Sequence, residues 1–202
     1  ASGDNGVVTL PLTGVDVISM RVHFANSGGI ADLELCEEVS TCELVDFSGY
    51  PGCTRITNQF ASQGVTSVTA TGGINQAWIF DSSNPTGGDW DLGTPNQQFN
   101  GPGIGNGGGS NNTALGNLLI IQERNGPADD NASGGDLNFT LAGPRTVNYV
   151  TVVDIEGGNN FIELTTTGGG VNGPSPNTGD NGVGQVIVNT SSVSSRRVRF
   201  SV

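Results

Sequence analysis

The sequence predicts an all-β fold, a jelly-roll-like antiparallel β-sandwich with long Gly- and Asn-rich loops. Short runs rich in Val, Ile, Thr and Phe recur along the 202 residues, and Gly, Asn, Asp and Pro separate them, which is the pattern of strands joined by turns. Hydrophobic residues make up 34% of the chain and 33 residues are glycine, so we expect a thin core and long loops. Many short strands without an amphipathic helix are typical of a sandwich.

The expected strands follow one another along most of the chain. They lie at residues 7–12, 17–24, 31–36, 65–70, 76–80, 118–122, 136–141, 146–155, 160–166, 184–188 and 195–202. The best helical candidate, residues 54–64, is short and ends at a glycine. Residues 96–112 are rich in Gly and Asn, and we expect them to form a long loop. The length of the chain suits one sizeable domain, because all-β sandwiches commonly form a single unit of this size.

A segment near the N-terminus recurs near the C-terminus. Residues 3–24, GDNGVVTLPLTGVDVISMRVHF, match residues 179–200, GDNGVGQVIVNTSSVSSRRVRF, without gaps and with ten identities in 22 positions. The first copy continues into the strand expected at residues 31–36, which the second copy lacks. We therefore divide the chain into residues 1–43, an N-terminal strand segment, and residues 44–202, a β-sandwich domain.

The repeat makes the N-terminal segment a candidate donor strand. A sandwich that lacks one strand leaves unpaired backbone N–H and C=O groups at a sheet edge, and another chain can pair with them. The expected assembly strand carries Ala31, Leu33 and Leu35, and would add to a neighbouring copy of the protein. Such a head-to-tail contact propagates into a filament. The alternative is that both copies pair within one sandwich and seal its own edges.

The charge of the chain limits its partners. The 19 acidic and 7 basic residues give a formal net charge of −12. No nucleic-acid partner is expected, because phosphates require a basic patch and the one basic cluster, Arg196, Arg197 and Arg199, alternates between the two faces of its expected strand. No apolar run approaches the roughly 20 residues that span a bilayer, so no membrane span is expected. Excess carboxylate suits divalent cations and an exterior environment, and we expect a secreted protein, extracellular or at the cell surface.

The three cysteines, Cys36, Cys42 and Cys53, lie close together in the sequence. They do not form a zinc pattern, because neither a CxxC motif nor a nearby histidine accompanies them. A disulfide between Cys36 and Cys42 that closes a short hairpin is the favoured pairing, and it leaves Cys53 as a free or intermolecular thiol. The other pairings stay open from the sequence alone.

Two loops concentrate oxygen ligands and predict a calcium site. Calcium takes about six to eight oxygens from carboxylates, amides and backbone carbonyls in flexible geometry. The candidate ligands are Asp81, Asn84, Asp89 and Asp91 in the first loop, and Asp129, Asp130 and Asn131 in the second. Asp154 and Glu156 alternate on one expected strand, so they are either additional ligands or a solvated face. Neither loop fits the EF-hand pattern, and the alternative is that these side chains cap turns.

The chain carries a series of motifs in a recognisable order. They are ITNQFASQGV at residues 56–65, IFDSSNPTGGDWDLGTPN at 79–96, GNLLIIQE at 116–123, DDNASGG at 129–135 and VVDIE at 152–156. This part of the chain resembles a β-sandwich domain of secreted bacterial surface proteins with a carbohydrate-binding-module-like architecture. The resemblance implies an extracellular sandwich and supports the calcium site. In the family, a strand pair like that of residues 17–36 usually ends the domain, whereas here the pair stands near the N-terminus and only half of it recurs, in a circularly offset or tandem-repeat form.

The sequence offers a candidate for ligand stacking but little for catalysis. Trp90 lies inside the first acidic loop, where an indole beside an ion can stack on a sugar ring, whereas Trp78 lies in an apolar run and is expected to pack in the core. The sole histidine, His23, lies in a strand-like run, and no G-x-S-x-G motif is present. Spacing along the chain does not locate a pair of glycosidase carboxylates in space, so that arrangement stays open.

These observations favour an extracellular, non-catalytic, calcium-binding β-sandwich. We expect it to act as a structural or adhesive subunit that assembles head to tail with copies of itself, by strand addition, into a surface filament or repeat array. The alternative is a calcium-dependent carbohydrate-binding module with glycans as partners. The repeated terminal segment separates the two hypotheses, because a stand-alone lectin has no use for it.

Overall fold

The computed structural model describes residues 7–13, 17–36, 42–97, 103–157, 159–166, 169–174, 176–191 and 198–199. The strands are β1 (Val7–Thr13), β2 (Val17–Phe24), β3 (Gly29–Cys36), β4 (Cys42–Asp46), β5 (Arg55–Ile56), β6 (Val65–Thr71), β7 (Ala77–Asp81), β8 (Asn117–Ile121), β9 (Gly135–Val153), β10 (Phe161–Thr166), β11 (Gly169–Pro174), β12 (Val183–Ser191) and β13 (Val198–Arg199). The short 3₁₀ helices η1 (Ala61–Gln63) and η2 (Trp90–Leu92) lie in the connections.

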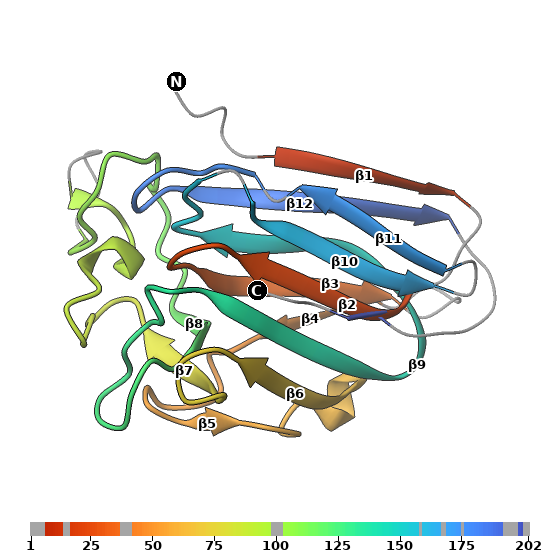
Figure 1. The fold of residues 1–202 in the computed structure, drawn as a ribbon, viewed down its shortest axis with the longest axis horizontal. Coiled ribbons are helices and arrows are strands. Elements are labelled where there is room, and N and C mark those ends of the chain that lie inside the picture. The colour runs from red at the N-terminus through yellow and green to blue at the C-terminus, as the bar shows by residue number, and fades with distance from the viewer. Residues whose placement is uncertain are drawn as a thin grey trace.

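The strands form two packed sheets that share the long strand β9 (Figure 1). One sheet, the β2 sheet, has the order β11-β10-β2-β9-β6. The other, the β3 sheet, has the order β1-β12-β9-β3, and both β4 and the run β8-β7-β5 lie along the remaining edge of β3. The expected all-β sandwich is therefore confirmed.

Strand β9 joins the two sheets because its two halves pair with different strands. Up to Arg145 it pairs with β2 and β6, and from Thr146 onward it pairs with β3 and β12. The sequence predicted two strands separated near Gly143 and Pro144, because proline cannot donate a backbone hydrogen bond within a sheet. The strand instead continues through the corner between the sheets, where its pairing changes partners and a missing N–H is tolerated.

The described strands pair in antiparallel fashion except at two places, and both of these join the two copies of the repeated segment. Strand β1 runs parallel to β12 at the outer edge of the β3 sheet, as Figure 1 shows. The two residues of β13 run parallel to β2. Parallel neighbours require a long connection, which the rest of the domain provides here.

The main core lies between the two sheets and receives alternate side chains from their strands. Phe60 is buried there, and the rings of Phe47 and Tyr50 contact it edge-on. Leu119 and Ile121 of β8 also point into this core. Leu118 and Ile120, at the alternate positions of β8, point to the opposite face of the β3 sheet. There, loops cover a second apolar cluster of Ala31, Phe80, Leu92, Leu118, Ile120, Ala128 and Val153. The part of the β3 sheet formed by β7 and β8 is therefore buried on both faces.

Strands β2 and β3 lie inside the two sheets, so residues 17–36 belong to the same sandwich as the rest of the described chain. Strand β2 lies between β10 and β9, and β3 has β9 on one edge and β4 and β8 on the other. Leu33 and Leu35 are buried in the main core, and Ala31 in the second cluster. The boundary expected after residue 43 thus separates no packed units here. The strand expected to be donated is paired on both edges within the chain.

Some strands were not expected from the sequence, and one expected strand falls mainly outside the described residues. Strand β4 is largely exposed, β5 has only two residues, and β11 has the Gly-rich sequence GGVNGP, so none has the apolar alternation of a typical strand. Of the strand expected at residues 195–202, only β13 is described.

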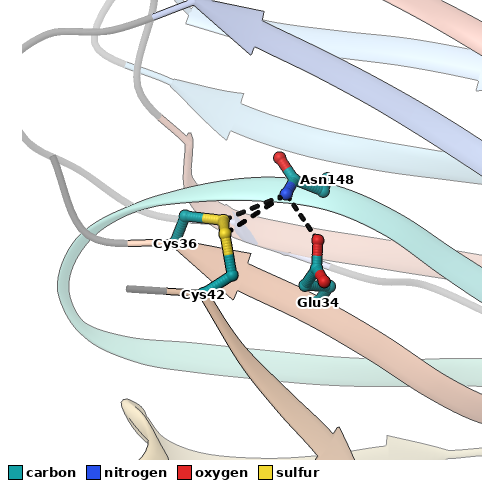
Figure 2. The surroundings of a disulfide bond; sticks show 4 residues. All are labelled: Glu34, Cys36, Cys42 and Asn148. Atoms are coloured by element: carbon teal, nitrogen blue, oxygen red, sulfur yellow. Dashed lines mark hydrogen bonds between the residues drawn. A yellow bond between two sulfur atoms is a disulfide. The ribbon is translucent and has the colours of Figure 1, made fainter. Parts of the chain in front are cut away.

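Cys36 and Cys42 form a disulfide at the end of the β3–β4 hairpin, the pairing that the sequence favoured (Figure 2). Asn148 on β9 donates its Nδ2 hydrogens to Glu34 at 2.5 Å and to the Cys36 sulfur at 3.0 Å. Cys53 is free and exposed. Glu34 and the two bonded cysteines lie close together, but sulfurs bonded to each other are not thiolate ligands, so this group is no metal site.

Candidate metal centre

Three carboxylates from distant parts of the sequence meet at one end of the sandwich. Asp91 lies in η2, Asp154 directly follows β9, and Asp180 lies in the turn before β12. One carboxylate oxygen of each residue lies within 4.8 Å of those of the other two. The loops between β7 and β8, which include η2, gather at the left of Figure 1. Three carboxylates at this separation repel one another unless protons or a cation neutralise them.

Asn181 links the three segments that carry these carboxylates. Its backbone N–H donates to Asp154 Oδ1 at 2.7 Å. Its side-chain Nδ2 donates to the backbone carbonyl of Asp91 and, at 2.7 Å, to that of Gly93. Asn181 and Asp154 each have a φ of 60°, the left-handed conformation that Asn and Asp tolerate better than most residues. Backbone strain of this kind concentrates at functional sites, where the surrounding contacts hold it.

Asp154 is the most deeply buried member of the cluster, with 1% of its surface exposed. Its Oδ2 accepts a hydrogen bond from Ser27 Oγ at 2.7 Å, and its backbone N–H donates to the carbonyl of Gly182 at 2.8 Å. Burial raises the pKa of Asp154 to about 7, and the charges of Asp91 and Glu156 add to this effect. The folded protein therefore ionises this carboxylate at a free-energy cost, which a bound cation would offset.

Asp91 has a buried oxygen without a donor. Its Oδ1 accepts no hydrogen bond from the residues that the structure describes. Burial raises the pKa of Asp91, and the charges of Asp180 and Glu156 raise it further. Buried acceptors normally have a partner, so an unpartnered oxygen on a carboxylate of this cluster fits a position for a cation.

A second set of carboxylates lies beside the first. Asp130 is 5% exposed, and its Oδ2 accepts a hydrogen bond from the backbone N–H of Gly28 at 3.1 Å. Its own backbone N–H donates to Asp89 Oδ2 at 2.8 Å. Burial raises the pKa of Asp130 well above its ordinary value, and the charges of Asp89, Asp154 and Asp91 raise it further. Ser27 donates to Asp154 and the next residue, Gly28, donates to Asp130, so the two sets lie side by side, and we call them together the acidic site.

Asp89 and Asp129 form the outer part of this site. Burial raises the pKa of Asp89 to about 6, and the charges of Asp129 and Asp91 contribute. Arg124 Nε lies 2.5 Å from Asp129 Oδ2 and balances that carboxylate. A Cβ at Gly87, where φ is 74°, would lie 2.5 Å from Asp129 Oδ1 and 2.7 Å from Asp89 Oδ2. The loop therefore needs glycine here, both for its backbone conformation and to leave room for the two carboxylates.

The structure brings some of the expected ligands together and places others in turns. Asp81 accepts hydrogen bonds from the backbone N–H and Oγ of Ser83, at 3.0 and 2.6 Å, and caps a turn. Asn131 donates its Nδ2 to the carbonyl of Gly134, again within a turn. These two residues follow the turn-capping alternative. The expected ligands that lie in the acidic site are Asp89, Asp91, Asp129 and Asp130.

Asp180 and Asn181 were not expected as site residues. They belong to the GDNGV sequence of the second repeat copy, and an Asp-Asn-Gly sequence normally indicates only a turn. Their position beside Asp91 and Asp154 depends on the pairing of β12 with β9. The recurrence of an acidic residue in both copies was the available signal. Glu156 is exposed and contributes charge to the site.

The two tryptophans lie in different surroundings. Trp90 is 51% exposed and precedes Asp91 in η2. Trp78 is half-buried, packs against the second apolar cluster and donates its Nε1 hydrogen to Gln76 Oε1 at 2.9 Å. An exposed indole at the rim of an acidic site is suited to stacking on a flat apolar ring face.

His23 lies on the outer face of the β2 sheet, among side chains of the neighbouring strands β9 and β10. His23 stacks on Phe161 with ring centroids 4.6 Å apart, and its Nδ1 lies 3.6 Å from Asp136 Oδ1. Arg21 lies 2.7 Å from Glu163 and 3.8 Å from Asp136. Burial lowers the pKa of His23, and the hydrogen bond to Asp136 opposes this effect. Contacts of this kind between neighbouring strands stabilise a sheet.

Comparisons with protein-family models, with curated proteins and with solved structures find no match to this chain. Among the described residues, no helical segment has the length and apolar character that crossing a bilayer requires. The fold and the site define the class of protein as a β-sandwich with a cluster of carboxylates at one end of its β3 sheet.

Proposed function

We propose that the protein is an extracellular, non-catalytic, calcium-binding β-sandwich. In this proposal it serves as a structural or adhesive subunit that assembles head to tail with copies of itself, by strand addition, into a surface filament or repeat array. The observation that carries the calcium assignment is the convergence of Asp91, Asp154 and Asp180, with the buried Asp130 beside them.

Calcium accounts for the chemistry of this cluster. The convergent groups are carboxylates, which calcium binds together with carbonyl oxygens in flexible geometry. Zinc sites, in contrast, are usually built with cysteine or histidine. Buried carboxylates without a compensating charge destabilise the folded state, and a divalent cation removes that repulsion.

Bound calcium would also have a structural effect. Its ligands would come from η2, from the end of β9 and from the turn before β12, which lie far apart in the sequence. One ion would therefore fasten the long loops between β7 and β8 to the β3 sheet. Binding to the folded state alone raises the free energy of unfolding by about 2.7 kcal/mol at a hundredfold excess over Kd.

Thermal unfolding with calcium and with EDTA tests the calcium assignment. We expect calcium to raise Tm by several degrees, and Asp91→Ala and Asp130→Ala to reduce this shift. Asp81→Ala is the matched control, because Asp81 caps a turn outside the acidic site and its loss should leave the shift unchanged. Identical melts in calcium and EDTA would show that the assignment is wrong.

The proposed assembly is supported by the repeated segment and by the parallel pairing of its copies at the edge of the β3 sheet. An edge strand has unpaired backbone groups that another chain can pair with. Sedimentation velocity of the full-length chain with calcium measures assembly directly, and we expect species that grow with protein concentration. A single monomeric species at high concentration contradicts the proposal.

The second candidate function is a calcium-dependent carbohydrate-binding module, and the exposed Trp90 beside Asp91 favours it. A glycan array with the calcium-loaded protein tests this function. Binding of one glycan class by the monomer, lost in Trp90→Ala and in EDTA, would rank this candidate first. Trp78→Phe is the control, because Trp78 is half-buried against the second apolar cluster.

A further inference from the structure

The repeated segment begins with a strand, β1 in the first copy and β12 in the second. Only one of these two strands pairs with β9 in the β3 sheet. Strand β12, from the second copy, takes the place beside β9, with Val183 opposite Val153 and Ile187 opposite Tyr149. Strand β1, from the first copy, lies on the outer edge of β12 and pairs with it in parallel (Figure 1). Both copies run in the same direction, so β1 can replace β12 on β9 without reversal of the chain.

A strand that replaces β12 beside β9 must meet two requirements. Along the strand, Gly184, Val186 and Val188 are buried, and the two valines belong to the main core. At the start of the strand, Asp180 joins the acidic site and Asn181 donates hydrogen bonds to its other members. A strand that fits this place therefore has small or apolar residues at alternate positions and an Asp-Asn-Gly turn before them.

The N-terminal copy has these features in the same order. Pro11 corresponds to Ile187, the last residue of β12 that pairs with β9, so its missing N–H affects only the end of the ladder. The other correspondences are Asp4 and Asn5 with Asp180 and Asn181, and Val8, Leu10 and Leu12 with Gly184, Val186 and Val188. Asp4 and Asn5 lie outside the described residues, so their correspondence is one of sequence alone.

We propose that residues 7–13 of one chain occupy the place of residues 183–189 in a second copy of the protein. The incoming segment adds a strand to β9 of that copy. This inference rests on the assembly proposed above, and it assigns the donated strand to β1 rather than to β3, which is paired on both edges. The contact is heterologous, so it propagates from chain to chain.

A disulfide between two full-length chains tests the exchange. Thr151 on β9 lies opposite Gln185, to which Thr9 corresponds, so exchange places Thr9 of one chain opposite Thr151 of another. Within one chain, Thr9 instead lies opposite Ile187, with β12 between it and β9. Two chains, one with Thr9→Cys and one with Thr151→Cys and both with Cys53→Ser, are mixed in calcium with a mild oxidant. We expect a covalent mixed dimer on non-reducing electrophoresis.

Thr13→Cys is the matched control for Thr9→Cys. It makes the same change on the same strand and at the same alternation, but four residues further along, about 13 Å from the position opposite Thr151. A disulfide joins Cα atoms no more than about 7 Å apart, so this control should lose the mixed dimer. Equal cross-linking by the two variants would overturn the exchange, because it would report collisions instead of a register.

A locked chain separates failure of this inference from failure of the proposed function. Thr151→Cys with Gln185→Cys, in the Cys53→Ser background, bonds β12 to β9 and closes the place to an incoming strand. We expect the locked chain to keep its calcium-dependent Tm shift but to remain monomeric, and reductant to restore assembly. If the unmodified chain never assembles, the proposed function fails. If the unmodified and locked chains assemble equally and no Thr9–Thr151 cross-link forms, the exchange fails and assembly stands.

Discussion

Replacing Asp154 by Asn should stabilise the protein in chelator and abolish its response to calcium. The Asn side chain has the same shape, and it can accept from the Asn181 N–H through Oδ1 while its Nδ2 donates to Ser27 Oγ. Both hydrogen bonds of Asp154 therefore persist, and the substitution chiefly removes one negative charge from the acidic site.

The magnitude follows from the pKa of Asp154, which is raised from 3.8 to about 7 in the folded protein. Each pKa unit corresponds to about 1.36 kcal/mol, so ionising Asp154 costs the folded state about 4 kcal/mol. The folded protein holds this proton more tightly than the unfolded chain does, so the free energy of unfolding falls as the pH rises from 3.8 through about 7. The advantage of Asp154→Asn is therefore near zero below this window and about 4 kcal/mol above it.

Urea unfolding at about pH 4 and about pH 8, with EDTA and with calcium, measures this difference. Asp81→Asn is the control, because it removes the same charge from a turn outside the site and should keep the calcium response. The reasoning is refuted if Asp154→Asn and the unmodified chain share one urea midpoint at both pH values in EDTA. It is also refuted if the variant keeps the full calcium response.

Three further predictions concern the main core, the turn that carries Asn181 and the disulfide. Phe47→Ala should lower the free energy of unfolding by about 3–5 kcal/mol, because Phe47 is fully buried. Leu44→Ala, on the exposed strand β4, should change it by less than about 0.5 kcal/mol. Urea unfolding of the two variants measures the difference. Asn181→Gly tolerates the φ of 60° but removes the donor of the Asp91 carbonyl and the shorter of two hydrogen bonds to the Gly93 carbonyl. We therefore expect a loss of about 1–3 kcal/mol in the free energy of unfolding and weaker calcium binding in a calorimetric titration. Replacing Cys36 and Cys42 by Ser removes a cross-link across a sequence separation of 6, and should lower the free energy of unfolding by about 2 kcal/mol, a loss that reductant should reproduce in the unmodified chain.

Local patterns predicted the class of the fold, because strand alternation and turn residues act over a few positions. The runs that form β3, β7 and β8 place residues in both apolar clusters, and the run that forms β2 alternates between the main core and a polar outer face. The path of β9 through Pro144 could not be predicted in this way, because it depends on which strands lie on either side of the corner. Strands β4 and β11 likewise exist because β3 and β10 provide hydrogen-bond partners for residues with little strand character of their own.

The sequence by itself determined that acidic residues would gather in loops, that Cys36 could bond Cys42, and that one segment occurs twice. Only the tertiary structure decided which of the acidic residues meet. Asp81 and Asp91 share one loop region, yet Asp81 caps a turn while Asp91 joins Asp154 and the distant Asp180. The physical reason is that spacing along the chain says little about separation in space, which here is set by the pairing of β12 with β9 and by the folding of the loops onto the outer face of the β3 sheet.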